Sequence, residues 1–477
     1  MVYTDDEALQ KKEGEEVSLD QIDGDMVVRT IYKPEAPTAA ISEFKVLLEL
    51  KGVGSKNGRL GVDLVTVLDI SGSMRGERIN KMKIAMRFLL KKLGGTDRLS
   101  VVTFNRKAAR LCPLLQITSD SQKKIIELIN NLEARSTTNT QAGLEMALDI
   151  LKNRIHNEGR RAAIMLLSDG MEDEESHAAK FSADNNDKVP IYTFSLDCDF
   201  DPQSLNDIAS HGGMFAAVTE VNNLTAAFSL SLAGILSVAI EDLTLTITPS
   251  NGYKVKEVEA GIYHRQKVDV DNPVIIRFGS LYDRETRKVL VKLALPEVTE
   301  QSGGVEIAYE YRVGGKDTLK SGTKSIRVTG KGISAVEENE EVLAEERRLR
   351  TASLMKEAKS LADKKKLGEG RAKLVHAKKK LSEGDATLIA QLDQLFHFMV
   401  SQETYDTKGH AFVLALEASH EAQRATTFTG DNAFKVRMFN TPLMDQFVEQ
   451  AVSFNENPEE YKVPTEEEDR LKVALVY

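Results

Sequence analysis

Apolar runs and amphipathic stretches alternate along residues 60–240. Residues 60–68 are almost continuously apolar, as in a strand buried on both faces of a parallel sheet. Apolar positions in residues 74–93 have helical spacing. The same alternation predicts further strands at 99–104, 109–116, 162–167, 191–196 and 214–219, and helices at 123–132, 141–151, 174–184, 205–210 and 224–240. This order predicts an α/β fold with a doubly wound, mostly parallel sheet. Since the connection after residue 104 is too short for a crossover helix, the strand that follows it should be antiparallel.

The pattern changes on both sides of this segment. Residues 241–332 alternate apolar and polar positions with a period of two, and turn residues separate the runs, which predicts a β-sandwich-like domain. Two half-buried strands are expected within 16–59, at 27–32 and 43–50. They have no obvious sheet of their own, so we expect them to complete the β domain. The α/β segment would then be an insertion in it.

The last third of the chain has helical spacing. Residues 333–477 are rich in Ala, Glu, Lys and Leu, which predicts a helical C-terminal region. Helices are expected at 342–367, 371–381 and 388–400, with glycines at 368–370 and 384 as connections. Two lysine runs, 364–366 and 378–380, are interpreted as solvated helix faces. Phenylalanines scattered through 403–477 are expected to pack on the chain's own domain, with docking on a partner as the alternative. Residues 1–15 are acidic and polar and are expected to be disordered.

Composition narrows the class of protein. The 477 residues include 29% charged residues, and the net charge is −10. A negative balance spread over both signs argues against a general nucleic-acid binder. Cys112 and Cys198 are the two cysteines, too few for a disulfide framework or a zinc ribbon. No long apolar segment suggests insertion into a membrane. We therefore expect a cytoplasmic protein, with a nuclear location also open.

Candidate chemistry follows the first buried strand. Asp69, Ser71 and Ser73 come together directly after its carboxyl end, in the crevice where open α/β sheets bind ligands. Short oxygen ligands suit a hard divalent cation, Mg²⁺ or else Mn²⁺ or Ca²⁺, better than zinc or copper. Two other segments should reach the same edge of the sheet, namely 136–140 before a helix and 163–170, a buried strand that ends in Asp169. One cation could therefore be shared by all three segments.

These residues resemble the metal-ion-dependent adhesion site of von Willebrand factor A domains. Residues 69–73 match its DxSxS motif, Thr138 looks like its metal-site threonine, and Asp169 like its aspartate. Ser136 and Thr137 stand where relatives often have glycines. The resemblance implies that Ser71, Ser73 and Thr138 bind the ion directly. Asp69 and Asp169 would hold its waters or, in some states, contact the metal themselves. One position would stay open for an Asp or Glu of a protein partner.

Over a longer stretch the chain resembles plant-type intracellular proteins that combine this domain with a C-terminal VWA/Hint-like region. Some relatives carry a RING finger and act as ubiquitin ligases. This chain lacks the cysteines for a RING finger, so the resemblance does not carry the ligase activity over.

Our leading hypothesis is a non-enzymatic interaction module that binds a partner's carboxylate through a divalent cation. A first alternative is a scaffold or regulatory subunit, related to the ubiquitin pathway, that works through its helical region with a vestigial metal site. A second is a metal-dependent phosphohydrolase with Asp69 as nucleophile. That chemistry needs a second acid two residues on, where Ser71 stands. The eight histidines show no metal or triad spacing and are interpreted as structural or surface residues.

Overall fold

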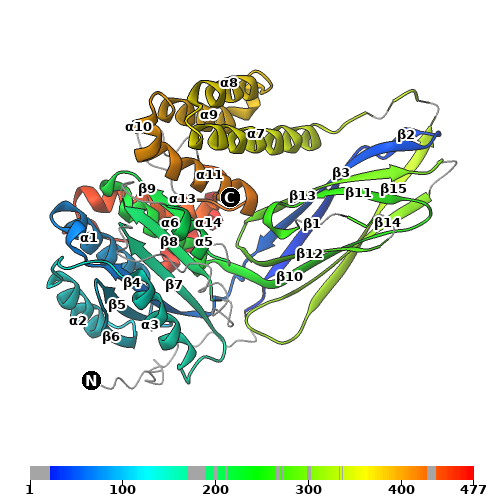
Figure 1. Cartoon of the computed structure of the whole chain (residues 1–477). Coiled ribbons are helices and arrows are strands. Elements are labelled where there is room, and N and C mark those ends of the chain that lie inside the picture. The colour runs from blue at the N-terminus through cyan, green and yellow to red at the C-terminus, as the bar shows by residue number, and fades with distance from the viewer. Residues whose placement is uncertain are drawn as a thin grey trace.

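The computed structural model describes residues 22–169, 189–196, 202–209, 212–264, 268–269, 272–297, 302–331, 333–335, 337–426 and 437–476. The helix expected at 174–184, the disorder expected at 1–15 and the environment of Cys198 lie outside these residues. Three parts make up the described chain: an α/β part, a β-sandwich beside it, and a helical layer across the top of the α/β part (Figure 1).

A six-stranded sheet forms the centre of the α/β part, in the order β6-β5-β4-β7-β8-β9. β6 is antiparallel to β5, and the remaining neighbours are parallel. The strands are β4 (Gly61–Asp69), β5 (Arg98–Phe104), β6 (Ala108–Gln116), β7 (Arg160–Ser168), β8 (Ile191–Leu196) and β9 (Phe215–Val218). The predicted fold class, including the antiparallel strand, is confirmed.

Helices cover both faces of this sheet and bury apolar side chains against it. α1 (Glu77–Lys92), α2 (Ser119–Asn130) and α6 (Leu224–Leu236) share one core, and α13 (Pro442–Glu456) from the C-terminal region joins it. On the other face, α3 (Thr140–Lys152) and α5 (Gln203–Ala209) share a core with α11 (His410–Ala422). The C-terminal helices therefore complete the α/β part.

The β-sandwich consists of two sheets around one apolar core, in the orders β1-β3-β13-β11 and β12-β10-β14-β15-β2. β3 pairs along its length with β13, and β2 pairs with β15. The strands are β1 (Asp25–Ile31), β2 (Glu35–Pro37), β3 (Ile41–Val53), β10 (Val238–Pro249), β11 (Lys254–Glu259), β12 (Val274–Tyr282), β13 (Thr286–Leu295), β14 (Ser302–Arg312) and β15 (Lys320–Lys331). Strands that precede the parallel sheet thus pair with strands that follow it.

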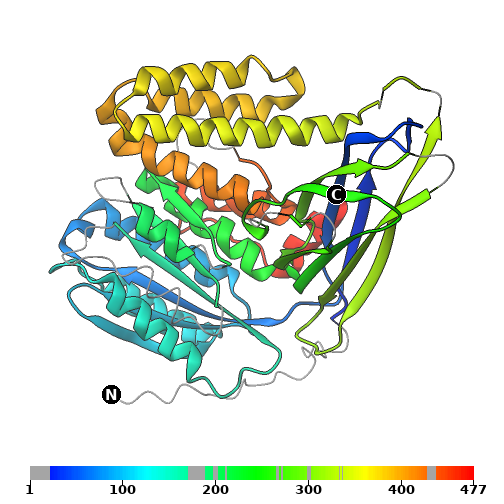
Figure 2. The same ribbon diagram turned by 45° about the vertical axis from the view of Figure 1, so that its right-hand side comes forward.

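The helical layer lies over α11, which itself lies on the parallel sheet (Figure 2). Its members are α7 (Glu340–Asp363), α8 (Leu367–Lys378), α9 (Ala386–Phe398), the short α10 (Gln402–Thr404) and a π-helical turn, Tyr405–Gly409, that leads into α11. The last helix, α14 (Glu466–Val476), is held by a buried ion pair between Lys92 and Asp469, 2.6 Å apart. Phe412, Phe447 and Phe454 are buried, whereas Phe428 and Phe434 lie outside the described residues.

Two predicted boundaries are wrong. The helix expected at 224–240 ends at Leu236, because Val238 and Ile240 already pair with β12 as the start of β10. Gly368 and Gly370 lie inside α8 and form no connection. Gly370 faces α7, where an added Cβ would meet the carbonyl oxygen of Ala358 at 3.0 Å. The chain turns instead at Lys365, which has a φ of 61°. Both lysine runs are exposed, as predicted.

A buried polar cluster joins the three parts. The hydroxyls of Tyr192 in β8 and Tyr282 in β12 are 2.7 Å apart. Arg424, just beyond α11, donates to Glu285 at 3.0 Å and lies over the Tyr282 ring. Because these side chains are buried, their hydrogen bonds hold the three parts together out of contact with solvent.

Candidate metal site

β4 carries Asp69 into the centre of the sheet's carboxyl edge. The strand lies between β5 and β7 and is buried from Val62 to Asp69. Its apolar side chains fill the cores on both faces, so the strand has no freedom to slide or rotate. The Asp69 side chain is fully buried at the end of this strand.

The loop after β4 folds back on that carboxylate. The backbone N–H of Ser71 donates to Oδ1 of Asp69 at 2.7 Å. The hydroxyl oxygens of Ser71 and Ser73 are 2.8 Å apart. Ser71 is buried and Ser73 is partly exposed. Two hydroxyls and a carboxylate of the predicted set therefore lie together.

A second loop is held against the first by two backbone hydrogen bonds. Arg135 N–H donates to the Ile70 carbonyl, and Gly72 N–H donates to the Ser136 carbonyl, both at 2.8 Å. Ser136 has a φ of 76°, in the left-handed region that favours glycine. Thr138 is buried at 6% exposure, whereas Thr137 is exposed.

The helix α3 then fixes the direction of this second loop. Asn139 caps the helix by accepting from the N–H of Ala142 at 2.9 Å. Gly143 brings α3 close to the sheet, since an added Cβ there would meet Val67 at 2.8 Å. Thr138 is thus placed by a capped helix packed directly on β4.

The third segment is the end of β7. Asp169 follows the last residue of that strand and is 4% exposed. The hydroxyl of Ser168 donates to Oδ2 of Asp69 at 3.1 Å. Burial and, secondarily, the charge of Asp169 raise the pKa of Asp69 to about 7, and hydrogen bonds from Ser71 and Ser168 oppose the shift. The two carboxylates are therefore close enough to repel each other.

Two residues of this site were missed from the sequence. Ser168 precedes the predicted Asp169, but strand alternation gave no reason to turn its hydroxyl toward Asp69. Arg78 in α1 lies 3.4 Å from Oδ2 of Asp169 and donates to the Ser73 carbonyl at 3.1 Å. Nothing in the spacing of α1 distinguishes Arg78 from the other basic residues of that helix.

The donor set fits a hard divalent cation. Arg78 offsets part of the charge of Asp169, whereas Asp69 has only hydrogen bonds from neutral groups, and all the donors of the predicted set are oxygens. Among the described residues there is no group of three or more His, Cys, Asp or Glu side chains arranged to hold a metal ion. A cation at this edge would therefore depend on Ser71, Ser73 and Thr138 as well as on carboxylates, which favours Mg²⁺ over soft metals.

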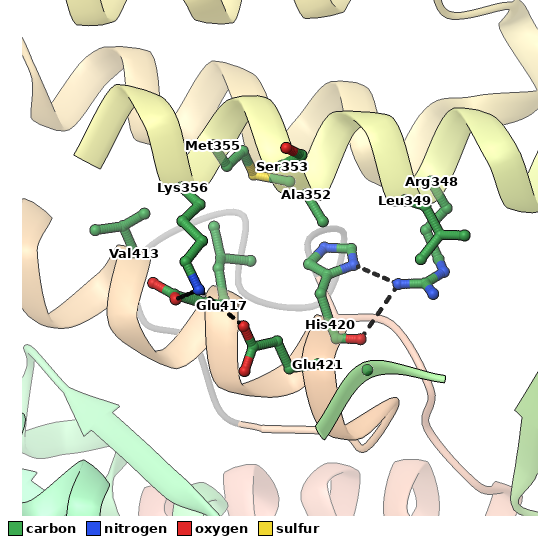
Figure 3. Close-up of a pocket in the computed structure, with 12 residues that line it drawn as sticks. Arg348, Leu349, Ala352, Ser353, Met355, Lys356, Val413, Glu417, His420 and Glu421 are labelled. Carbon is green, nitrogen blue, oxygen red and sulfur yellow. Dashed lines mark hydrogen bonds and ion pairs between the residues drawn. The ribbon is translucent and has the colours of Figure 1, made fainter. Parts of the chain in front are cut away.

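A second concave site lies between α7 and α11, with a volume of about 210 Å³ (Figure 3). Its titratable centre is His420. Nδ1 of His420 lies 3.2 Å from Nη1 of Arg348, and Nε2 lies 2.9 Å from Oε1 of Gln391. Arg348 can only donate, so Nδ1 accepts and Nε2 carries the proton. Both ring nitrogens are engaged, which makes His420 a structural residue and not a base.

Family comparisons agree with this geometry. Residues 63–230 match the von Willebrand factor type A domain, and residues 383–453 match the family described as VWA / Hh protein intein-like. The chain is 28% identical over 280 residues to the E3 ubiquitin-protein ligase WAV3 of Arabidopsis thaliana, covering 57% of this chain and 36% of that protein. It is 31% identical over 138 residues to the human voltage-dependent calcium channel subunit alpha-2/delta-2, covering 28% of this chain and 12% of that one.

Solved structures support the fold alone. A von Willebrand factor type A protein from Catenulispora acidiphila superposes with a TM-score of 0.64 at 16% identity, over 84% of this chain and 97% of that chain. The ArnB paralog VWA2 from Sulfolobus acidocaldarius gives 0.53 at 16% identity, over 83% and 99%. The match to WAV3 spans about a third of that protein's length. None of the described helices combines the length and apolar content that a bilayer crossing requires. The chain thus carries a von Willebrand factor type A domain followed by a VWA / Hh protein intein-like segment.

Proposed function

We propose that the chain is a protein-interaction module that binds its partner through a divalent cation at the carboxyl edge of the parallel sheet. The observation that carries the proposal is the burial of Asp69 beside Asp169, with the Ser71 and Ser73 hydroxyls 2.8 Å apart on the same loop. Two repelling carboxylates next to neutral oxygen donors form a site whose electrostatics favour a doubly charged ion.

The residues divide by their chemistry. Ser71, Ser73 and Thr138 would hold the ion directly. Asp69 and Asp169 would accept hydrogen bonds from its water ligands. Neutral direct ligands leave a bound Mg²⁺, or Mn²⁺ or Ca²⁺ in its place, electrophilic enough to attract an external carboxylate. Choosing Thr138 over Thr137 is supported by the burial of Thr138 and the exposure of its neighbour.

The partner we propose is a protein that offers an Asp or Glu side chain. A module with a net charge of −10 has little general affinity for nucleic acid. A bound cation would attract an acidic side chain of a protein partner electrostatically. We propose binding and not catalysis, since Ser71 occupies the position where a phosphoryl-transfer site would need its second acid.

Fluorescence anisotropy with labelled Asp- or Glu-containing peptides tests this function. Matched peptides with Asn or Gln in place of the acid serve as control ligands. We expect binding in Mg²⁺ to be lost in chelator and in the double variant Asp69→Ala, Ser71→Ala, and to persist in Thr137→Ala. Equal affinity in Mg²⁺, in chelator and in the double variant would contradict the proposal.

A second candidate is a scaffold in the ubiquitin pathway. Three matched relatives from Arabidopsis thaliana are named ubiquitin ligases or probable ones. These 477 residues contain two cysteines, which cannot build a RING finger, so we propose no ligase reaction for them.

The scaffold candidate needs a test that leaves the fold intact. Deleting the helical region would uncover both faces of the parallel sheet, because α11 and α13 belong to its cores. Charge reversal of the exposed lysines at 364–366 avoids this problem. Loss of a partner in that variant, with chelator-resistant binding in the wild type, would favour the scaffold over the metal-dependent module.

A further inference from the structure

A cavity of about 860 Å³ lies at the opposite edge of the parallel sheet from the metal site. Its walls come from the end of α3, the segment between α3 and β7, the starts of β7 and β8, the end of α6, the start of β10, and β12. The lining residues used below are Lys152, Arg154, Arg160, Arg161, Glu241 and Asp242. The α/β part and the β-sandwich meet here, so a ligand would touch both.

Arginines from three separate segments surround one carboxylate behind this cavity. Arg98 in β5 forms a bidentate pair with Asp63, with both nitrogen–oxygen distances at 2.7 Å. Nη1 of Arg154 lies 2.8 Å from Oδ2 of Asp63, and Nε of Arg160 lies 2.8 Å from Oδ1. Asp63 and Arg98 are fully buried. Three guanidinium groups therefore share one negative charge.

The cavity side of this cluster is positively charged. Among the described lining residues, four carry positive charge and two carry negative charge. Both negative groups are engaged, since Glu241 pairs with Arg161 at 2.8 Å and Asp242 lies 3.7 Å from Arg312. Asp97 also acts on Arg160, and its own carboxylate pairs at 2.7 Å with Arg59, which it shares with Glu466. Burial, together with repulsion from Arg98, lowers the pKa of Arg160.

Arg154 and Arg160 link the buried cluster to the cavity. Their side chains are 14% and 6% exposed, so they are desolvated enough for an anion to gain from contact with them. Planar guanidinium groups match the oxygen geometry of carboxylates and phosphates. A single carboxylate is already present as Asp63, and an excess of two positive charges remains around it. A dianion balances that excess better than a monoanion.

We propose that this cavity is a binding site for a small phosphate compound, with Arg154 and Arg160 as the anchoring side chains and Lys152 at its rim. The volume lies within the range of small-molecule sites, roughly 300–1,000 Å³, and this favours a soluble phosphate ester or diphosphate over a protein surface. The site is separate from the metal site, since the two lie at opposite ends of β4. Bound phosphate would tie the start of β7 to the start of β10.

Isothermal titration calorimetry with pyrophosphate tests the proposal. The full chain is used at low ionic strength with chelator present, so that metal-bound phosphate cannot contribute. We expect saturable binding of one ligand per chain. Arg154→Gln should lower the affinity by roughly tenfold or more, because a charge-assisted hydrogen bond is lost. The exposed Arg106→Gln, which removes the same charge elsewhere, should leave binding unchanged.

Two further variants keep the test decisive. Lys152 is exposed and lies outside the Asp63 cluster, so Lys152→Gln should fold normally and lower the affinity by roughly threefold. Asp69→Asn should bind pyrophosphate like the wild type. Absence of saturable binding at millimolar pyrophosphate, equal affinity in Arg154→Gln and the wild type, or loss of binding in Asp69→Asn would each overturn the proposal.

Discussion

An aspartate is buried at each end of β4, and the two carboxylates have neighbours of opposite charge. Asp63 at the amino end is surrounded by Arg98, Arg154 and Arg160, all within 2.8 Å. Asp69 at the carboxyl end receives hydrogen bonds from Ser71 and Ser168 and faces a second carboxylate, Asp169. One carboxylate is neutralised by the protein itself. The other remains next to a like charge.

The Asp63 end therefore has an excess of positive charge, whereas the Asp69 end has two neighbouring carboxylates. Internal cations at the Asp63 end make that carboxylate part of the fold, and removing it would leave buried positive charge. At the Asp69 end, we propose that a divalent cation would relieve the repulsion between the two carboxylates. The two aspartates are equally buried, and the sign of the neighbouring charges distinguishes them.

The largest expected effect on stability is at the Asp63 end of β4. Asp63→Asn leaves three arginines around a neutral amide, and we expect it to lower the free energy of unfolding by about 3–5 kcal/mol. Urea denaturation followed by circular dichroism measures the change. Asp317→Asn, at a fully exposed aspartate, is the matched control and should be neutral. A loss below about 1 kcal/mol would show that the arginines do not depend on Asp63.

His420 is a third buried titratable group, and its surroundings keep it neutral. Burial and the neighbouring Arg348 lower the pKa of His420 to about 3. Below about pH 6.5, His420 binds a proton in the unfolded chain but stays neutral in the folded chain. The free energy of unfolding therefore falls as pH falls.

Between about pH 6.5 and 5, His420 should account for about 2 kcal/mol of lost stability. His420→Gln should therefore flatten the pH dependence of the unfolding free energy in this range, whereas His376→Gln, at an exposed histidine, should not. Parallel pH profiles of the wild type and His420→Gln would refute this account of His420.

At the Asp69 end of β4, the same Asp-to-Asn substitution should change the free energy of unfolding in the opposite direction. In chelator, Asp69→Asn removes one of two repelling buried carboxylates, and we expect it to raise the free energy of unfolding by about 1 kcal/mol. The measurement is the same urea titration used for Asp63→Asn. If Asp69→Asn destabilises the protein as much as Asp63→Asn does, the two ends of β4 do not differ as proposed.

The smallest effect concerns the loop that supports Thr138. Ser136 has a φ of 76°, which costs a non-glycine residue roughly 1 kcal/mol. Ser136→Gly should therefore stabilise the protein slightly, by about 0.5 kcal/mol after the entropy of glycine is subtracted. Thr137 does not have a positive φ, so Thr137→Gly should destabilise the protein through the added entropy of the unfolded chain. Thermal unfolding of the two variants decides the point, and stabilisation by Thr137→Gly alone would contradict it.

The sequence predicts the fold class well because the buried strands are nearly continuous apolar runs. It also proposes Asp69, Ser71, Ser73, Thr138 and Asp169 as one site, since parallel strands deliver their carboxyl ends to one edge. The structure shows Ser71 and Ser73 in contact with each other, and Asp69 and Asp169 buried at the ends of the neighbouring strands β4 and β7. Membership of all five in a metal site stays a prediction.

Other features could not be predicted from local patterns. Arg98, Arg154 and Arg160 come from separate segments, and only the folded chain brings them to Asp63. The end of α6 was missed because residues 237–240 are as apolar as a helix core, and pairing with β12 makes them a strand. Gly370 resembles a helix breaker, yet its missing side chain lets α8 approach α7. Each of these outcomes depends on a distant partner.

Titration of Mg²⁺ into the chelator-treated protein by isothermal calorimetry tests the central claim most directly. We predict one site per chain in the wild type and in Thr137→Ala, and no measurable binding in Asp69→Asn, Ser71→Ala or Thr138→Ala. Absence of Mg²⁺, Mn²⁺ and Ca²⁺ binding in the wild type, or binding that Asp69→Asn and Ser71→Ala leave unchanged, would contradict it.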